Sequence, residues 1–110
     1  MTITEMAKAF SLEVIQGEYE DKDIKAAYTS DLLSDVMGNA DEESILITIQ
    51  AHKNTIAVAT LKDSPAIIIC NNRPIPEDMI SVAKEEGIAI FLTDKNQFEI
   101  SGLLYNAISK

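Results

Sequence analysis

Seven polar side chains that could bind a ligand follow the apolar segments of this 110-residue sequence, at the points where strands would end. They are Ser30, Asp31, Gln50, His52, Asn71, Arg73 and Thr93. Together they offer hydrogen-bond donors, one imidazole and one guanidinium, a set that suits a small anionic or nucleotide-like ligand. Most of these residue types also cap helices and form turns, so a structural role for all seven is the alternative interpretation.

An α/β fold would bring these side chains together. Apolar runs at 45–50, 66–70 and 88–92 recur at a nearly constant spacing and are continuous, which is typical of parallel strands covered by helices on both faces. Further strands are expected near 11–15 and over 24–29, and the N-terminal part could pair antiparallel to the rest. We therefore predict a mostly parallel sheet of about five strands with helices packed on it. The carboxyl ends of parallel strands share one edge, where ligands commonly bind.

Helix signals occupy the segments between these runs. Helices are expected over 3–10, 31–37, 52–63, 76–86 and 94–108. Pro76 fits the first helical position, and Gly87 fits the left-handed position that ends a helix. Asp94 and Gln97 have capping-box spacing at the start of the last helix, whose apolar residues share one face. These helices would cover the predicted sheet.

Asp31 and Asp35 are four residues apart in a segment whose apolar residues have helical spacing, so both carboxylates are expected on one helix face. Two carboxylates could bind a divalent cation, but no third ligand is near in the sequence, and we predict no metal site. The alternative is that Ser30 or Asp31 caps the helix while Asp35 is solvated. Gly38 and Asn39 would then end the helix.

Composition predicts one globular domain over residues 1–110 and a cytoplasmic location. A net charge of −9 repels nucleic-acid backbones and anionic lipid heads, so neither is an expected partner. No apolar run approaches the roughly 20 residues of a membrane helix, and the N-terminal segment lacks the features of an export signal. The single cysteine, Cys70, lies in an apolar run and is expected to be a buried thiol.

Three segments resemble the DRTGG domain family: SDLLSDVM (30–37), QAHKNTIAVA (50–59) and NNRPIPE (71–77). These domains are similar to the N-terminal domain of HPr kinase/phosphorylase. The resemblance extends over nearly the whole chain and implies a single DRTGG-like domain of HPr kinase N-terminal-domain-like fold. It further implies a regulatory or assembly module, often dimeric, without an established reaction. The bend GEYEDKDIKAA (17–27) departs from the family pattern because it lacks the Asp-Arg pair.

Kinase activity is not expected of this sequence. The kinase part of the HPr enzyme needs a phosphate-binding loop, G-x-x-x-x-G-K-[ST], and the four glycines here are Gly17, Gly38, Gly87 and Gly102. No two of them have the required spacing. A nucleophile elbow is absent too, which leaves a small enzyme as the weakest alternative. We predict no catalytic residues and no cofactor.

Two functions of different classes remain open from the sequence. The first is a regulatory module that binds a small anionic metabolite or nucleotide at the strand-end residues. The second is a protein-interaction or dimerisation scaffold in which the same residues only cap helices and form turns. A combined form, a homodimer with a regulatory ligand, accommodates both, and a partner protein is a further candidate.

Overall fold

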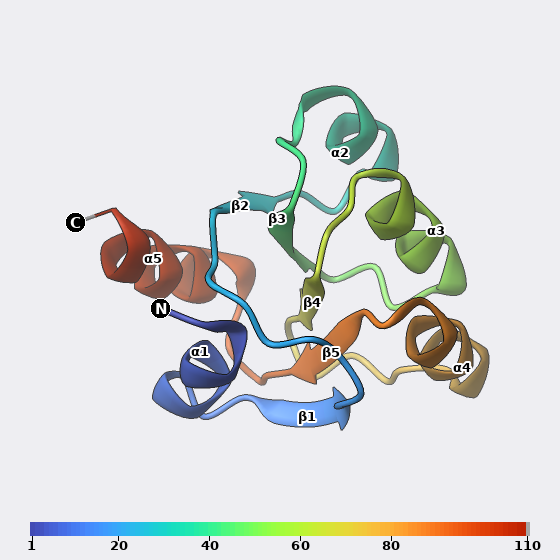
Figure 1. Ribbon diagram of the computed structural model, residues 1–110, viewed down its shortest axis with the longest axis horizontal. Helices are drawn as coiled ribbons and strands as arrows, with labels where there is room; N and C mark the ends of the chain where they lie inside the picture. Colours follow the sequence, from blue (N-terminus) through green and yellow to red (C-terminus); the bar gives the residue numbers. More distant parts are fainter. Residues whose placement is uncertain (110) are drawn as a thin grey trace.

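The apolar runs form neighbouring parallel strands at the centre of one five-stranded sheet (Figure 1). The computed structural model describes residues 1–109. The strands are β1 (Glu13–Gln16), β2 (Ala26–Thr29), β3 (Ser44–Thr48), β4 (Ala66–Ile69) and β5 (Ala89–Leu92). The helices are α1 (Ile3–Ala9), α2 (Leu33–Asn39), α3 (Lys53–Leu61), α4 (Glu77–Glu86) and α5 (Gln97–Ile108). The predicted α/β fold is confirmed.

The strand order across the sheet is β1-β5-β4-β3-β2. Strands β2, β3, β4 and β5 run parallel, and β1 pairs antiparallel with β5 at one edge. The antiparallel pairing expected of the N-terminal part is therefore confirmed for β1 and is wrong for β2, which runs parallel to β3 at the opposite edge. The register of β1 shifts between Val14 and Gln16, so this edge strand is irregular. The opposite edge strand, β2, pairs with β3 in an unbroken register.

Helices cover both faces of the sheet, which explains why the central strands lack an alternating pattern. Helices α1 and α5 lie on one face, and α2, α3 and α4 lie on the other (Figure 1). Ile47 and Ile68 belong to the first core, whereas Leu46 and Ile67 belong to the second. Every residue of β3 and β4 is buried as a result.

The capping residues predicted for the helix ends are confirmed only in part. Gly87 ends α4 with a φ of 68°, as expected of the left-handed C-cap. Pro76 is the N-cap of α4 and not its first helical residue. Helix α5 begins later than predicted, at Gln97, and its capping box joins Asn96 to Glu99.

Helix α2 also begins later than the sequence suggests. Its N-cap is Leu32, which makes no side-chain capping bond, so neither Ser30 nor Asp31 caps it. The helix runs through Asn39, which was expected to lie in the terminating turn. Asp31 lies outside the helix, whereas Asp35 lies in its first turn. The carboxylates of Asp31 and Asp35 therefore do not share a helix face, as had been expected. No helix within residues 1–109 has the length and apolar content that crossing a membrane requires.

Candidate functional site

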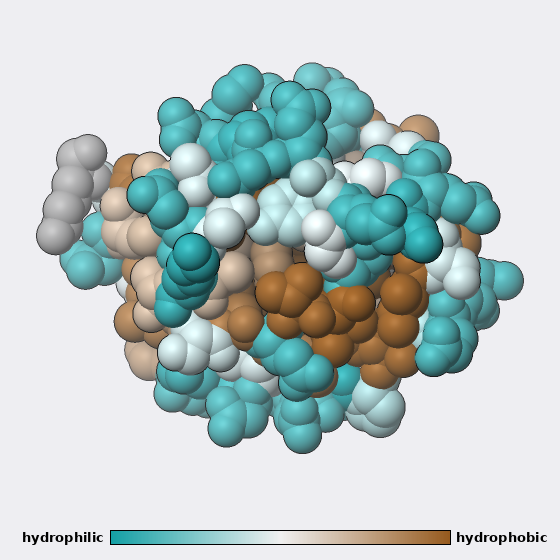
Figure 2. Space-filling model, turned by 60° about the horizontal axis from the view of Figure 1, so that its bottom comes forward, coloured by the Kyte–Doolittle hydropathy of each residue, from teal (hydrophilic) through white to brown (hydrophobic). Residues whose placement is uncertain are grey.

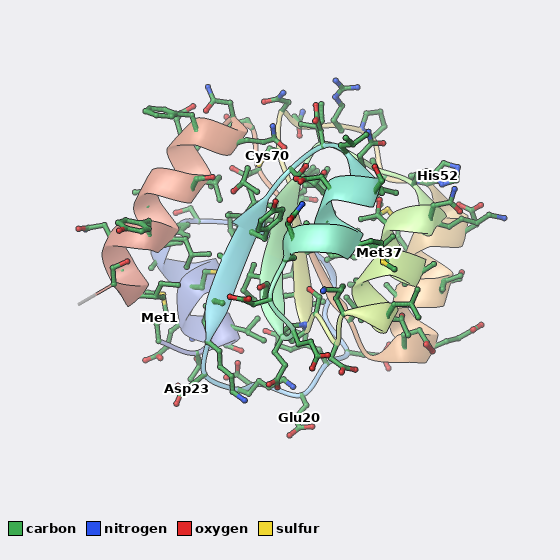
Figure 3. All side chains as sticks on the ribbon, turned by 90° about the horizontal axis from the view of Figure 1, so that it is seen from above. Met1, Glu20, Asp23, Met37, His52 and Cys70 are labelled. Atoms are coloured by element: carbon green, nitrogen blue, oxygen red, sulfur yellow. The ribbon has the colours of Figure 1, made fainter. Side chains whose placement is uncertain are left out.

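The carboxyl ends of the four parallel strands lie at one edge of the sheet, as predicted. We call the segments that follow them, 29–31, 49–52, 70–73 and 93–95, the carboxyl rim. Figure 3 shows His52 and Cys70 toward this end of the molecule, with Glu20 and Asp23 at the opposite end. All seven predicted site residues therefore belong to one edge. What differs among them is whether their side chains are free.

Two of the seven, Ser30 and Gln50, hold the loops after β2 and β3. The Gln50 side chain donates to the carbonyl of Asp31 at 2.7 Å, joining the two loops. The Ser30 hydroxyl accepts from the backbone N–H of Leu32 at 3.1 Å. The backbone of Gln50 is also engaged, because its carbonyl accepts from the hydroxyl of Thr55 at 2.7 Å. The side chains of Ser30 and Gln50 therefore stabilise these two loops.

The loops after β4 and β5 are joined in a similar way. Asn71 and Asn72 have φ values of 60° and 50°, and their N–H groups donate to the carbonyls of Lys95 and Thr93 at 2.9 and 2.8 Å. Thr93 is buried, and its hydroxyl accepts from the N–H of Lys95 at 3.2 Å. Thr93 is thus a structural residue. The turn places the exposed side chains of Asn71 and Arg73 at the rim.

His52 is the N-cap of α3. Its Nδ1 accepts from the N–H of Asn54 at 3.0 Å, and the side chain is exposed. Helix capping was the alternative to ligand binding for this residue. The bond uses one ring nitrogen only, so Nε2 remains directed to solvent and available to a ligand.

Arg73 is an exposed cation of the rim. The ion pairs of the described chain join Lys22, Lys25 and Lys84 to glutamates, and none of them involves the Arg73 guanidinium. An ion pair with Glu77, one turn away, is therefore not formed. Helix α4 begins just after this segment without a side-chain cap. Its free N–H groups favour an anion, whereas the carboxylates of Glu77 and Asp78 in its first turn oppose one.

The sequence suggested a solvated Asp35, but the Asp35 side chain makes hydrogen bonds within the protein. Its carboxylate accepts from the Tyr28 hydroxyl at 2.9 Å and from the Asn39 amide at 2.8 Å. These hydrogen bonds, first that of Tyr28 and then those of Ser30 and Asn39, lower the pKa of Asp35. Within residues 1–109 no group of three or more His, Cys, Asp or Glu side chains could hold a metal ion. The carboxylate instead ties α2 to β2.

Replacing Tyr28 by phenylalanine tests this tie through the pH dependence of stability. A carboxyl group whose pKa is lowered by folding stabilises the protein above its unfolded pKa, near 3.8, and that contribution is lost as the pH falls through the lower folded value. We therefore expect Tyr28→Phe to be less stable than the native sequence at neutral pH, with the difference shrinking on acidification below 3.8. Urea unfolding at a series of pH values measures it.

Tyr19→Phe is the matched control for that experiment. The Tyr19 hydroxyl bonds to the hydroxyl of Thr4 and not to a carboxylate. Its removal should change the free energy of unfolding by an amount that varies less with acid, because the Tyr19 hydroxyl reaches a carboxylate, Asp21, only through Thr4. Parallel pH curves for the native chain and Tyr28→Phe would contradict the assigned role of Asp35.

Two hollows lie away from the predicted residues. One, of about 600 Å³, lies between β2 and α5 and is lined by residues that include Phe98, Gly102 and Tyr105. The other, of about 350 Å³, is lined by Glu20 and Asp63 among others. Neither hollow is lined by any of the seven predicted residues. The first hollow was not predicted from the sequence, although α5 has only one charged residue, Glu99.

Much of this chain resembles known proteins. The family model described as HPr Serine kinase N terminus matches residues 36–108. The HPr kinase/phosphorylase of Streptococcus uberis is 35% identical over 63 residues, which cover 56% of this chain and 20% of that protein. The protein of the same name from Streptococcus equinus is 50% identical over 40 residues, covering 36% of this chain and 13% of that protein. The matches therefore span a fifth or less of these relatives' length.

A solved structure shares the fold of this chain. It contains the CBS and DRTGG domains of the regulatory region of Clostridium perfringens pyrophosphatase, complexed with the activator diadenosine tetraphosphate. The TM-score is 0.73 and the identity 15%, over 93% of this chain and 45% of that one. The resemblance to DRTGG domains and to the HPr kinase N-terminal domain is confirmed.

Proposed function

The chain belongs to the HPr kinase N-terminal domain family, and we propose that it is a non-catalytic regulatory module. In this proposal, residues 1–110 form a single DRTGG-like domain that binds a small anionic or nucleotide-like ligand at the carboxyl rim. The observation that carries it is the exposed guanidinium of Arg73. It lies on the edge where parallel strands end and helices begin, free of the ion pairs that engage Lys22, Lys25 and Lys84.

Chemistry supports a phosphate-bearing ligand. A guanidinium donates two parallel hydrogen bonds to a phosphate, which gives both strength and orientation. The exposed amide of Asn71 and the Nε2 of His52 are further donors on the same rim. The regulatory region of the C. perfringens pyrophosphatase is complexed with a nucleotide that carries several phosphates. That precedent motivates nucleotides as the first class to test with this chain.

The proposal excludes phosphoryl transfer by these residues alone. The sequence has no phosphate-binding loop, and its four glycines are far apart. The matched part of the curated HPr kinases is only a fifth or less of each protein. A regulatory role uses binding energy alone, since a ligand that favours one state of a protein shifts its population without any reaction.

A thermal-shift experiment with Arg73→Ala tests the ligand site. The probes are ATP, diadenosine tetraphosphate and inorganic triphosphate. A ligand at one hundred times its dissociation constant stabilises a folded protein by about 2.7 kcal/mol, which raises the melting temperature by several degrees. We expect one of these probes to raise the melting temperature of the native chain, and Arg73→Ala to lose most of the rise. High salt should weaken the effect because it screens the attraction between the Arg73 guanidinium and the phosphates of the ligand.

Lys8→Ala is the matched control, because it removes one exposed positive charge from the last turn of α1. It should respond to the ligand as the native chain does. Arg73→Lys, which keeps the charge but not the two-pronged geometry, should retain part of the rise. The ligand proposal fails if none of the probes stabilises the native chain, or if Arg73→Ala responds fully.

Assembly of two copies is the second candidate function, and a different observation favours it. Phe98 and Tyr105 project from α5 and are 86% and 74% exposed, beside the 600 Å³ hollow. Exposed aromatic side chains beside an apolar hollow are typical of interaction surfaces. A pure scaffold would use this surface alone and would leave the rim without a ligand.

A further inference from the structure

Strand β2 leaves one edge of the sheet unpaired within the described chain. The N–H of Ser30, just after β2, donates to the carbonyl of Ile47 in β3. Backbone groups alternate in direction along a strand, so Tyr28 also faces β3, whereas Ala27 and Thr29 direct their N–H and C=O groups outward. Figure 3 looks onto this edge, where β2 lies in front of the sheet between α5 and α2. These outward groups are available to another strand.

The two edges of the sheet differ in their protection against such pairing. Natural edge strands avoid pairing through charges, prolines or bulges. Strand β1 has both a charge, Glu13, and an irregular register. Strand β2 has the sequence AAYT, with no charge and no proline, and its register is regular. Both edge strands are only four residues long, but β2 alone lacks a charge and a bulge within the strand.

Contacts on both faces hold β2 in place. On one face, the Tyr28 hydroxyl donates to Asp35 of α2 at 2.9 Å. On the other, the hydroxyls of Thr29 and Ser101 of α5 are 2.6 Å apart. A strand that is already ordered loses little conformational entropy when it pairs, which favours association.

Helix α5 carries a second stripe beside this edge, in addition to the one buried against the sheet. The stripe consists of Phe98, Ser101, Gly102, Tyr105 and Ser109, which share one helix face because they are three or four residues apart. It contains no charge, and α5 as a whole has one charged residue, whereas the shorter α4 has five. A helix that faced only solvent would carry charges here. The stripe is therefore suited to contact with protein.

The stripe and the β2 edge enclose the 600 Å³ hollow, and its chemistry favours a second copy of this chain. The lining residues include Lys25 and no acidic side chain, although the chain has 18 acidic residues and a net charge of −9. Two such chains repel each other except where their surfaces lack negative charge. A Cβ atom at Gly102 would meet nothing within 4 Å, so there is space for a closely approaching helix.

We infer that the β2 edge and the α5 stripe form a twofold interface between two copies of this chain. Around a twofold axis near Tyr28, the two β2 strands pair antiparallel, with Ala27 of each copy opposite Thr29 of the other. This pairing makes roughly four backbone hydrogen bonds and continues the sheet across the dimer. The two α5 helices then lie on the same face and cover the seam. Such an interface is self-complementary, because the projecting aromatics and the hollow belong to one surface.

This interface rests on the proposed assembly role and specifies which surface of the chain would form the dimer.

A competing surface exists at the other edge of the sheet, where hydrophobic side chains gather over β1 (Figure 2). Val14 is the large exposed side chain there, at 55%. Because Glu13 and the irregular register of β1 oppose strand pairing, we assign the interface to β2 and use Val14 as the control position.

Sedimentation equilibrium of the native chain and of Phe98→Glu locates the interface. The native chain should be a dimer at micromolar concentration. Phe98→Glu places a carboxylate on each side of the seam, and we expect the dissociation constant of the dimer to rise at least about tenfold. Tyr105→Glu should act in the same direction. Both side chains are mostly exposed, so circular dichroism should show an intact fold. Val14→Glu should remain a dimer.

Amide hydrogen exchange tests the strand pairing itself. In the dimer, the N–H groups of Ala27 and Thr29 should be protected, and this protection should be lost in Phe98→Glu. The N–H of Tyr28 faces β3 and should be protected in both proteins, so it is an internal control. Exposed Ala27 and Thr29 amides in a dimeric native chain would overturn the inference.

The outcomes separate the interface from the function that it serves. A monomeric native chain at high concentration would overturn both the assembly role and the interface. A dimer that Phe98→Glu leaves intact, or that Val14→Glu dissociates, would overturn the β2 interface but keep the assembly role. Neither result depends on the response of Arg73→Ala to nucleotides.

Discussion

Replacing Phe91 by alanine is expected to lower the free energy of unfolding by about 3–5 kcal/mol. Phe91 is a fully buried residue of β5 in the core beneath α1 and α5. The Tyr19 ring meets it edge-on, with 6.0 Å between ring centroids and 83° between planes. Alanine would remove both this aromatic contact and the burial of the ring, and leave a cavity. Since domains of this size are stable by only about 5–15 kcal/mol, much of the stability would be lost.

Urea unfolding followed by circular dichroism measures this change. Leu61→Ala is the control, because Leu61 lies on the exposed face of α3 and its removal should change the free energy of unfolding by about 0.5 kcal/mol or less. Equal effects of the two substitutions would show that Phe91 is not part of a tightly packed core. Tyr19→Leu should lower stability less than Phe91→Ala, because Tyr19 is only partly buried and leucine still packs against the core.

The central sheet could be predicted from the sequence because its cause is local and repeated. Residues around Ile47, Ile68 and Ile90 are apolar without alternation, and only a strand covered on both faces buries such a run. Similar spacing of the runs leaves room for one helix between them. Parallel direction and a shared carboxyl edge then follow from chain connectivity.

Helix starts were harder to predict because several residues satisfy the same capping rule. Asp94 with Gln97 and Asn96 with Glu99 both have capping-box spacing, and the structure uses the second pair. The choice depends on tertiary contacts: the carbonyl of Lys95 accepts from the N–H of Asn71, and this bond extends the loop by two residues before α5 begins. No local pattern contains that information.

The carboxyl-rim residues, too, could be predicted only in part from the sequence. Their common edge was predictable, but the partners of their side chains were not, because these partners lie in neighbouring loops. Gln50 bonds to the carbonyl of Asp31, and His52 bonds to the N–H of Asn54. Arg73 and Asn71 keep exposed side chains because their turn projects from the sheet. The α5 stripe was not predicted, because the expected helix, 94–108, also contains Asp94 and Lys95, whereas the observed helix has one charged residue.

The thiol of Cys70 is expected to react with an aromatic disulfide reagent at least about a hundredfold more slowly in the folded chain than in denaturant. Cys70 follows β4 and is fully buried. Burial raises its pKa from 9.0 to about 11. Because the thiolate is the reactive form, two pKa units alone lower its fraction about a hundredfold near neutral pH, and the reagent must also reach the core.

Absorbance of the released aromatic thiolate follows this reaction, and the double variant Cys70→Ser with Ser81→Cys provides the control. Ser81 lies on the exposed face of α4, so its replacement thiol should react at the rate of a free cysteine in both the folded and the unfolded chain. In the native chain, modification must wait for an opening of the core, so the logarithm of its rate should fall in proportion to any increase in the free energy of unfolding. A Cys70 that reacts as fast as the Ser81→Cys thiol would place it at an accessible site and would reopen a chemical role for the loop between β4 and Arg73.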